Sequence, residues 1–400
     1  MTAPGAEECT RRVVIVGSGI AGTAAALALS ARAANVDVTM IQGAAGSTVL
    51  AGGAFDGGDA LSADARAVLS EIGFVNTKEG AIVATTAGRL REVSGMDSAM
   101  LDLGELSHTT VLLPRANHGN WDADYLARAL SSDSLAKARG LRFAAVSARL
   151  VQNTEELSMA DAELARRNSS EARVSWLASQ LAPLRTEFPD AGACLLPPWL
   201  PLHGAALATL REKVAFPLGE SVGLPPGPTG LRFLRARDAS LAARKVRQVP
   251  GFVSSIMRDG EGFTVTLADE STVFAAVIIL ATGNLVSGGL RYNSAESFPA
   301  GELPVRSELP FALTFSAPVT LGASGRPLLV PGSLFGEAPE TIAWPFVRNP
   351  LMERVGILTE NRQAAPSIFA CGDAEADSPR TWLGALEAGT QAGLSALLVV

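Results

Sequence analysis

The stretch RVVIVGSGIAG (Arg12–Gly22) has the strongest structural pattern in the chain. Its first half, Val13–Val16, is a continuous apolar β-branched run, as expected of a parallel strand that is buried on both faces. Gly17, Gly19 and Gly22 then follow with the spacing G-x-G-x-x-G. Such glycines allow a tight turn, a close approach of backbone to a phosphate, and close packing of helix on strand. The stretch therefore predicts a strand, a nucleotide-phosphate cradle and a helix over residues 20–34.

Composition excludes several classes of protein. The length of 400 residues favours two domains. A formal net charge of −7 provides no basic surface for nucleic acid. The three cysteines (Cys9, Cys194 and Cys371) lack the spacing of a zinc or iron–sulfur site, so we predict no metal site. No apolar run reaches the roughly 18 residues of a membrane-spanning helix, and the polar N-terminus does not resemble a signal peptide. We expect a cytoplasmic protein without a membrane span.

Further short apolar strands extend the predicted sheet. Strands are expected at 36–41, 277–280 and 367–370, and a helix from Trp382 to the C-terminus. Residues 249–256, 262–267 and 273–280 are interpreted as strands, with a turn at Asp259-Gly260 between the first two. The region in between alternates short strands with helices, which indicates a second α/β domain. Its predicted elements lie at 109–113, 122–130, 141–147, 160–180 and 193–196, followed by an irregular crossover at 216–232 and a helix at 240–246.

These elements predict an α/β fold with two domains. The first is Rossmann-like, with a parallel central sheet flanked by helices and a small antiparallel sheet, and is discontinuous. The second is an inserted α/β domain for substrate or partner binding. The predicted boundaries are 1–92, 246–292 and 345–400 for the first domain, and 93–245 and 293–344 for the second.

The end of the second predicted strand bears on the choice of cofactor. Dinucleotide sites usually have Asp or Glu there, which hydrogen-bonds the adenosine ribose, whereas this chain has Gln42. A loop of small residues follows and contains Ser47, Thr48, Gly52 and Gly53. Such a loop is either a surface loop or a segment whose backbone approaches a flat ring, and we favour the second interpretation.

Three short motifs in order resemble flavoproteins of the glutathione-reductase and fumarate-reductase type. They are GSGIAG at 17–22, ATGN at 281–284 and ACGDA at 370–374. The resemblance implies that the ATG strand crosses beside the dinucleotide and that Asp373 hydrogen-bonds the ribityl chain of a flavin. A carboxylate at the end of a parallel strand is suited to accept such bonds. The last helix would direct its N-terminus at the pyrimidine oxygen of the flavin.

Other stretches are similar to one family in particular, the flavin-binding subunit that accompanies the catalytic subunit of anaerobic glycerol-3-phosphate dehydrogenase. They are SGGL at 287–290, PLGESVGLPPGPTGLRF at 217–233, WPFVRNPLMERVGILT at 344–359 and STVLAGG at 47–53. The resemblance implies a flavin subunit, usually with FMN, that works with a catalytic FAD subunit and an iron–sulfur subunit. It also implies peripheral association with the cell membrane through a partner. Gly372-Asp373 departs from the Gly-Ser that family members can have at this place.

The predicted cofactor is a flavin. Gln42 favours FMN, which lacks the adenosine ribose, while the complete phosphate loop favours FAD; we prefer FMN narrowly. The predicted cofactor-binding residues are Gly17, Gly19, Ile20, Ala21, Gly22, Gln42, Ser47, Thr48, Gly52, Gly53, Val253, Thr282, Gly283, Gly372 and Asp373.

No catalytic residue is assigned from the sequence. His108, His118 and His203 are the only histidines and are candidates for a base in alcohol oxidation, although such residues are more often structural. Arg291 is a candidate phosphate ligand or a surface ion pair. Cys371 has no CxxC partner and is interpreted as a small buried hydrophobe.

Three functional hypotheses follow. The first is an oxidoreductase subunit that relays electrons from the oxidation of sn-glycerol 3-phosphate to an iron–sulfur, quinone-reducing partner. The second is a stand-alone FAD-dependent oxidase or dehydrogenase that acts on another small substrate. The third is a structural subunit that keeps the fold without cofactor chemistry.

Overall fold

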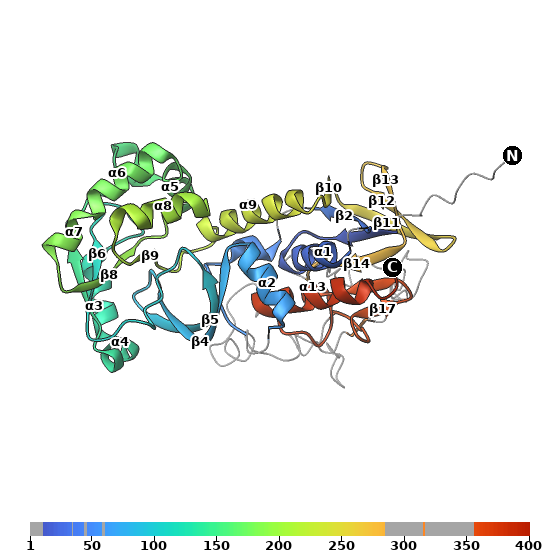
Figure 1. Ribbon diagram of the computed structural model, residues 1–400, viewed down its shortest axis with the longest axis horizontal. Coiled ribbons are helices and arrows are strands. Elements are labelled where there is room, and N and C mark those ends of the chain that lie inside the picture. Colours follow the sequence, from blue (N-terminus) through green and yellow to red (C-terminus); the bar gives the residue numbers. More distant parts are fainter. Residues whose placement is uncertain (1–10, 34, 44–45, 58–60, 285–314, 317–355) are drawn as a thin grey trace, which may run out of the picture. The chain divides into compact units, whose positions relative to one another are not determined.

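The computed structural model describes residues 11–33, 35–43, 46–57, 61–284, 315–316 and 356–400 (Figure 1). These residues form two units. Unit 1 takes the described residues within 1–47, 62–68 and 240–400, and unit 2 takes those within 48–61 and 69–239. Residues 1–92 are expected from the sequence to belong to the first domain. Residues 69–92 instead belong to unit 2, where β4 (Phe74–Ala84) pairs with β5 (Leu90–Asp97). Most of the predicted segment 293–344 lies outside the described residues.

Unit 1 is built on a six-stranded sheet in the order β10-β2-β1-β14-β18-β17. All neighbours are parallel except β17, which runs antiparallel to β18 at one edge. The strands are β10 (Arg247–Pro250), β2 (Asp37–Gln42), β1 (Arg12–Val16), β14 (Val277–Leu280), β18 (Ile368–Ala370) and β17 (Gln363–Ala365). The predicted parallel strands and the final helix are confirmed, and so is the Rossmann-like α/β class.

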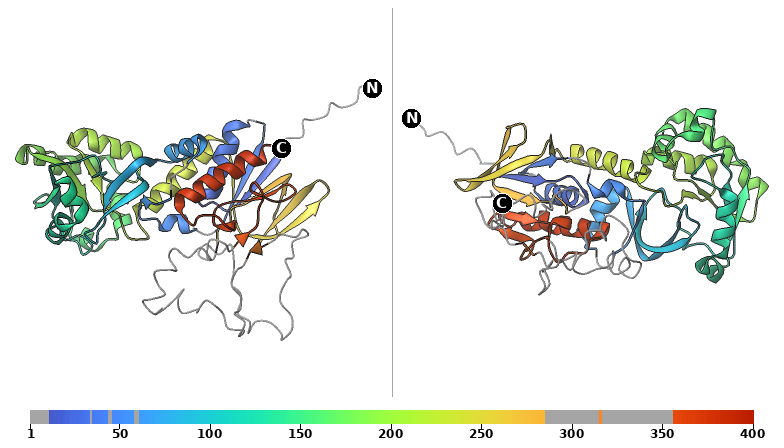
Figure 2. Two further views of the ribbon diagram at one scale, coloured as in Figure 1. Left: turned by 90° about the horizontal axis from the view of Figure 1, so that it is seen from below. Right: turned by 180° about the vertical axis from the view of Figure 1, so that it is seen from behind.

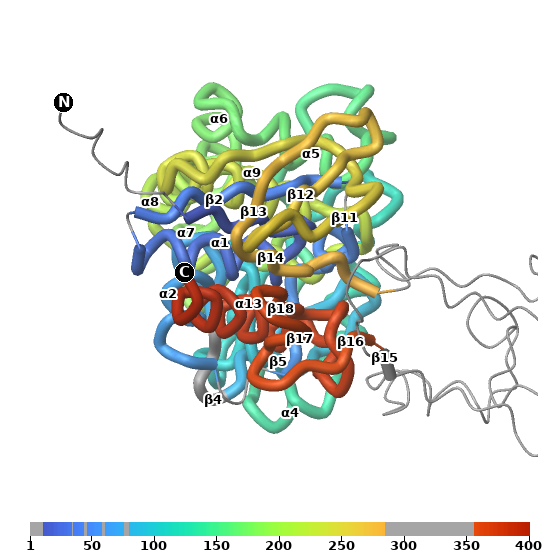
Figure 3. The backbone as a smooth tube through the Cα atoms, turned by 90° about the vertical axis from the view of Figure 1, so that its right-hand side faces the viewer, coloured from blue at the N-terminus to red at the C-terminus, as the bar shows by residue number. Residues whose placement is uncertain are grey.

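Two layers cover this sheet. The buried side chains of Val14, Ile278 and Leu280 pack against a three-stranded antiparallel sheet, the yellow and orange strands in Figure 2. That sheet consists of β11 (Val253–Asp259), β12 (Gly262–Leu267) and β13 (Thr272–Ala275). Because side chains alternate along a strand, Val13 and Ile15 face the other side. There α1 (Ile20–Arg32) and α13 (Trp382–Ala396) lie side by side (Figure 3).

Two predicted strands are each divided between two sheets. Residues 249–256 are expected to form one strand, but the backbone turns at Gly251, where φ is +147°. The chain before it becomes β10 of the parallel sheet, and the chain after it becomes β11 of the antiparallel sheet. Likewise 273–280 divides at Ala276 into β13 and β14, which belong to different sheets. Apolar residues stand on both sides of each break and are suited to either sheet, so the residue pattern does not show where the chain passes from one sheet to the other.

Unit 2 contains a second parallel sheet, in the order β7-β6-β8-β9. Its strands are β6 (Thr110–Pro114), β7 (Arg142–Val146), β8 (Ala191–Leu196) and β9 (Leu218–Glu220). The antiparallel sheet β3-β5-β4, with β3 at Ala54–Phe55, completes the strands described for this unit. The surrounding helices are α3 (Ala123–Ser132), α4 (Ser134–Arg139), α5 (Asp161–Arg167), α6 (Glu171–Leu181), α7 (Pro183–Glu187) and α8 (Gly204–Val214).

The remaining described elements are short or run from one unit into the other. They are α2 (Ala63–Glu71), α9 (Pro228–Ala243), the 3₁₀ turns η1 (Ser47–Leu50), η2 (Thr154–Ser158) and η4 (Gly372–Ala374), and the short strands β15 (Phe315–Ser316) and β16 (Gly356–Ile357). The predicted irregular crossover at 216–232 is confirmed only as far as Gly227, apart from the short strand β9, and the predicted separate helix at 240–246 is wrong. One helix, α9, takes up residues 228–243, since Pro228 is tolerated in the first turn of a helix.

A buried ionic network fixes the start of α9 in unit 2. The Arg232 guanidinium donates hydrogen bonds to the carboxylates of Asp97 (2.7 Å) and Glu220 (2.5 and 2.9 Å). It also donates to the carbonyl oxygens of Leu200 and Pro201. Burial opposes the charge on Arg232, but the two carboxylates outweigh it and raise the pKa of the guanidinium. The stretch rich in Pro and Gly between Glu220 and Arg232 is thus held by opposite charges at its two ends.

Candidate cofactor site

The glycine stretch between β1 and α1 forms a cradle of backbone. Gly17 has φ of +113°, and a Cβ there would lie 2.2 Å from the carbonyl oxygen of Ala281. A Cβ on Gly22 would lie 2.0 Å from the carbonyl oxygen of Gly17. Neither position has room for a side chain. Gly19 is the N-cap of α1, and the first turn of that helix contains no acidic residue. The helix dipole at this end is therefore left to favour a phosphate.

The ends of β14 and β18 meet this cradle. The N–H of Ala281 donates to the Val16 carbonyl oxygen (2.9 Å), and the N–H of Cys371 donates to that of Leu280 (3.0 Å). A Cβ on Gly17 would also lie 3.2 Å from the backbone nitrogen of Thr282, and a Cβ on Gly372 would lie 2.6 Å from the Cβ of Ala21. The structure thus places the GSGIAG, ATGN and CGD motifs around the first turn of α1.

Asp373 lies in η4, directly after β18. Its side chain is 28% exposed. Burial raises the pKa of this carboxyl, and the Arg380 guanidinium, whose nearest nitrogen is 3.9 Å away, lowers it less. Among the described residues, no donor makes a hydrogen bond to the Asp373 carboxylate; Arg380 donates to the Asp373 carbonyl oxygen instead. A largely desolvated carboxylate with free acceptor positions is suited to a ligand that offers hydroxyl groups.

The edge beyond β2 offers polar and aromatic groups. The Gln42 Nε2 donates to Oε1 of Gln248 on the neighbouring strand β10. A Cβ on Gly43 would lie 3.1 Å from the ring of Phe252, which is 58% exposed. Val253 follows as the first residue of β11 and is half-buried. Phe252 is not among the residues predicted from the sequence, because 249–256 is expected to form one strand, in which an aromatic residue is normally part of a core.

The small-residue loop has a structural reason for its glycines within unit 2. A Cβ on Gly52 would lie 2.7 Å from the carbonyl oxygen of Gly223. Gly53 has φ of +104°, and a Cβ there would lie 2.2 Å from the Met100 side chain. Thr48 is buried in η1, next to the half-buried Ser47. Contact of these four residues with a flat ring stays a prediction, since the packing of the chain on itself already requires glycine at both positions.

The final helix is fixed against α1 by glycines. A Cβ on Gly389 would lie 2.0 Å from the carbonyl oxygen of Ala21, and one on Gly393 would lie 2.5 Å from that of Ala25. The Thr381 side chain caps α13 by accepting a hydrogen bond from the Gly384 N–H (3.0 Å). This backbone contact fixes α13 relative to the cradle.

The histidines predicted as candidate bases lie in unit 2, and the candidate phosphate ligand Arg291 lies outside the described residues. His118 bonds the Met159 carbonyl oxygen through Nε2 (2.8 Å), and the Nε2 of His203 lies 2.6 Å from Arg235. His108 adopts φ of +48° in a loop of unit 2. Arg291 and the SGGL motif lie outside the described residues. No catalytic residue is assigned from the structure.

The described residues include the Cys371 thiol and other side chains of the types that bind metal ions. Burial raises the pKa of the Cys371 thiol to about 12. This is a property of an unreactive, buried thiol. Within the described ranges, no cluster of three or more His, Cys, Asp and Glu side chains is arranged to hold a metal ion. None of the helices in those ranges combines the length and apolar character that crossing a bilayer requires.

Comparison with known proteins gives distant structural similarities. No family model and no curated protein matches the sequence. Among solved structures, a flavin-dependent halogenase from Xanthomonas campestris has a TM-score of 0.36 at 13% identity, over 97% of this chain and 71% of its own. A putrescine oxidase variant has a TM-score of 0.32 at 13% identity, over 97% of this chain and 99% of its own.

A third similar structure is the ferredoxin-flavin thioredoxin reductase from Clostridium acetobutylicum. Its TM-score is 0.25 at 13% identity, over 43% of this chain and 78% of its own. Identities and TM-scores this low assign neither a family nor an activity. The family of the chain is therefore left open, and its function has to be inferred from its own residues.

Proposed function

We propose that this chain is a flavin-dependent oxidoreductase or a flavin-binding subunit of one. The observation that supports it is the meeting of three strand ends at the first turn of α1, with the Asp373 carboxylate beside them and without a hydrogen-bond donor among the described residues. A pyrophosphate would be held by the cradle around Gly17 and Gly22 and by the α1 dipole. Asp373 would accept a hydrogen bond from a ribityl hydroxyl.

We further propose FAD as the flavin, in place of the FMN that Gln42 alone favours. The end of β2 has no carboxylate, but other groups there could bind an adenosine. They are the hydrogen-bonded amides of Gln42 and Gln248 and the exposed ring of Phe252. Amides hydrogen-bond ribose hydroxyls, and an aromatic ring stacks on a base. These groups fit an adenosine, which FMN does not have.

The residues of the chain have separable tasks in this proposal. The bound flavin supplies hydride or electron transfer. The cradle binds and orients the phosphates through backbone, because no side chain fits there. Asp373 orients the ribityl chain, and α13 directs its N-terminal dipole at the end of the sheet where the cradle lies, which favours negative charge on a reduced ring.

The finer role, electron relay from sn-glycerol 3-phosphate oxidation to an iron–sulfur partner, rests on the sequence resemblance to the flavin-binding subunit of the anaerobic glycerol-3-phosphate dehydrogenase. Two of its four stretches, at 47–53 and 217–233, lie in the described ranges; SGGL lies outside them, as does most of 344–359. The buried pairing of Glu220 with Arg232 gives the second stretch a structural role. The relay requires a partner with iron–sulfur clusters, since this chain has only three cysteines.

The proposal is tested by purifying the chain without denaturation and identifying the released flavin by mass. We expect FAD at about one per chain. Asp373→Asn should lower flavin content strongly. Asp377→Asn, which changes a nearby carboxylate after η4, is the matched control and should keep it. A colourless protein that does not take up added FAD or FMN contradicts flavin binding, whereas FMN alone contradicts only the choice of FAD.

The relay is tested separately. The relay is supported if sn-glycerol 3-phosphate reduces the flavin only when a co-purified catalytic subunit is present. Reduction of the isolated chain by another small substrate would favour a stand-alone dehydrogenase. If the chain binds flavin but the flavin is reduced in neither experiment, the proposed electron transfer is contradicted and only the proposed cofactor site is supported.

A further inference from the structure

Unit 2 has an open pocket at the carboxyl ends of its parallel strands. Its volume is about 1160 Å³. It is lined after β6 by Arg115–Asn117, after β7 by Ser147–Glu155 and Leu157, and on the helical side by Ser179, Gln180 and Pro183. In open α/β sheets, ligands bind outside the carboxyl ends of the strands, near the point where the strand order reverses. This pocket lies at the carboxyl ends of β6 and β7, whereas the order β7-β6-β8-β9 reverses on the other side of β6, between β6 and β8.

Two arginines of this pocket are held in place by the chain itself. The Arg149 Nε donates to the Val151 carbonyl oxygen (3.0 Å), and its Nη2 donates to that of Gln152 (2.6 Å). Arg115 binds Asp124 through the same two nitrogens, each at 2.8 Å. Among the described residues, neither Nη1 makes a hydrogen bond, and Arg149 has no carboxylate partner. The pocket therefore has two oriented guanidinium groups with remaining donors.

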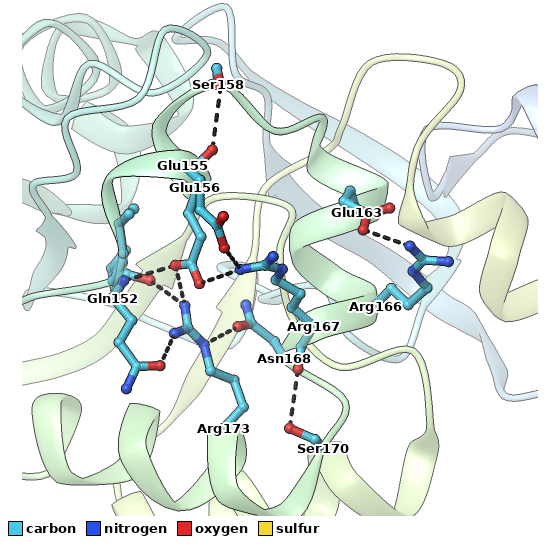
Figure 4. Close-up of polar contacts among 12 residues, drawn as sticks. Gln152, Glu155, Glu156, Ser158, Glu163, Arg166, Arg167, Asn168, Ser170 and Arg173 are labelled. Atoms are coloured by element: carbon cyan, nitrogen blue, oxygen red, sulfur yellow. Dashed lines mark hydrogen bonds and ion pairs between the residues drawn. The ribbon is translucent and has the colours of Figure 1, made fainter.

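A buried ion pair between Glu156 and Arg173 anchors the loop that carries Arg149 (Figure 4). Glu156 accepts hydrogen bonds from the Gln152 N–H (2.8 Å) and from Arg173 Nη2 (2.7 Å). Arg173 Nη1 donates to the Gln152 side chain (2.6 Å). Burial would raise the pKa of Glu156, but these bonds and one from Arg167 outweigh it and lower the pKa. The hydrogen bonds of Glu156 and Arg173 to Gln152 hold the loop in one conformation, which preorganises it for binding.

The remaining lining groups narrow the chemistry of the ligand. Glu155 also lines the pocket, but its charge is matched by Arg167 at 2.7 Å. Asn117, Asn153 and Gln180 supply amides, and Ser147, Thr154 and Ser179 supply hydroxyls. Both kinds of group donate and accept hydrogen bonds, as sugar hydroxyls do. No aromatic ring is among the described lining residues, so a nucleobase would have no stacking surface on them.

We propose that this pocket binds a small hydroxylated phosphomonoester of the sugar-phosphate class, with its phosphate on Arg149 and Arg115. The proposal is independent of the proposed flavin function, because none of the lining residues belongs to the cofactor set. Volume and lining fit a ligand larger than inorganic phosphate: the arginines would hold the phosphate, and the amides and hydroxyls would hold the sugar.

The test is calorimetric titration of the full chain with ribose 5-phosphate, inorganic phosphate and ribose. It is run with and without saturating FAD, because a phosphate can also enter the glycine cradle. We expect saturable binding of ribose 5-phosphate in both conditions, weaker binding of phosphate, and none of ribose. Arg149→Gln should weaken ribose 5-phosphate binding about tenfold, since a charge-assisted hydrogen bond is lost. Arg149→Lys should have an affinity for ribose 5-phosphate between those of the parent and Arg149→Gln, because lysine keeps the positive charge but not the two-pronged guanidinium geometry.

Arg142→Gln is the matched control, because Arg142 is an exposed arginine at the opposite end of the same strand, β7. It should leave binding and flavin content unchanged. Absence of saturable binding of ribose 5-phosphate at millimolar concentration overturns the proposal. Equal weakening by Arg142→Gln and Arg149→Gln, or binding that disappears when FAD is added, also overturns it. If Arg149→Gln does not fold, Asn153→Ala with its expected several-fold loss takes its place.

Discussion

The cradle of unit 1 and the insertion unit 2 are stabilised in opposite ways. At the cradle, backbone meets backbone, and Gly17, Gly22 and Gly389 are required because a Cβ would overlap a carbonyl oxygen. In unit 2, buried charges hold loops and strands together, as Arg232 does with Asp97 and Glu220. Each side of the cradle comes from a short glycine-containing motif, although Gly17 meets Ala281 and Gly389 meets Ala21 from distant parts of the chain. The ionic network instead joins single charged residues up to 135 residues apart.

The largest effect is expected from closing the cradle with Gly22→Val. The new side chain would overlap the Gly17 carbonyl oxygen, since a Cβ alone would lie 2.0 Å from it. We expect loss of bound flavin and destabilisation of unit 1 by several kcal/mol, the range of overpacking with backbone displacement. Flavin absorbance and denaturant unfolding measure the two effects. Gly46→Ala is the control, because nothing lies within 4 Å of a Cβ there; equal damage by both variants would contradict a steric role for Gly22.

The next effect is expected from breaking the ionic network with Arg232→Met. Two buried carboxylates would remain without their cation, which costs about 3–5 kcal/mol. Denaturant unfolding of unit 2 checks this value, with Arg235→Met on the same helix as the matched control. Adding Asp97→Asn and Glu220→Gln should recover part of the loss, because it removes the uncompensated charges. If the added substitutions recover no stability, the loss in Arg232→Met comes from altered packing and not from the uncompensated charges.

Asp373→Asn is expected to have two smaller effects of opposite sign: a slight gain in the stability of the flavin-free chain and a loss of flavin affinity. A carboxyl whose pKa is raised by folding binds its proton more tightly in the native state, so stability falls as pH rises from the ordinary value, about 3.9, through the raised one. At neutral pH the flavin-free variant should therefore be slightly more stable than the parent, while its flavin affinity drops at least tenfold. Thermal unfolding against pH and flavin titration measure both. A loss of stability at neutral pH contradicts the pKa direction.

The smallest effect is expected for the thiols of the native protein. Cys194 of β8 and Cys371 after β18 are fully buried, and burial raises the pKa of both. In a Cys9→Ser background, neither should react with an alkylating reagent at pH 8 until its unit opens. Gly22→Val should expose Cys371 first, and Arg232→Met should expose Cys194 first. Labelling of both thiols at the same rate within each variant would mean that the units unfold together.

Much of unit 1 was predictable because its signals are local. The strands of its parallel sheet are apolar on both faces, and the glycine spacing has few alternatives, so the strand Val13–Val16, the helix after it and the motif at 370–374 could be recognised. The break at Gly251 could not, because a single glycine in a β-rich stretch is also typical of a bulge. Phe252 was missed as a consequence.

Unit 2 was predicted in outline only. Its alternation of strands and helices was readable, but α9 was hidden by the prolines and glycines that precede and begin it. The pairing of Arg232 with Asp97 leaves no local signal, and neither does that of Arg173 with Glu156. Arg149 looks like any surface arginine until the ends of β6 and β7 are placed side by side. Long-range charge pairing is what a single sequence does not reveal.

Flavin binding at the cradle is tested most simply by the mass of the flavin released from the purified chain, compared between the parent and Asp373→Asn. We expect FAD at about one per chain from the parent and a small fraction of that from the variant. A parent chain that takes up no flavin, or a variant that retains it fully, would contradict the cofactor site built from the cradle and Asp373.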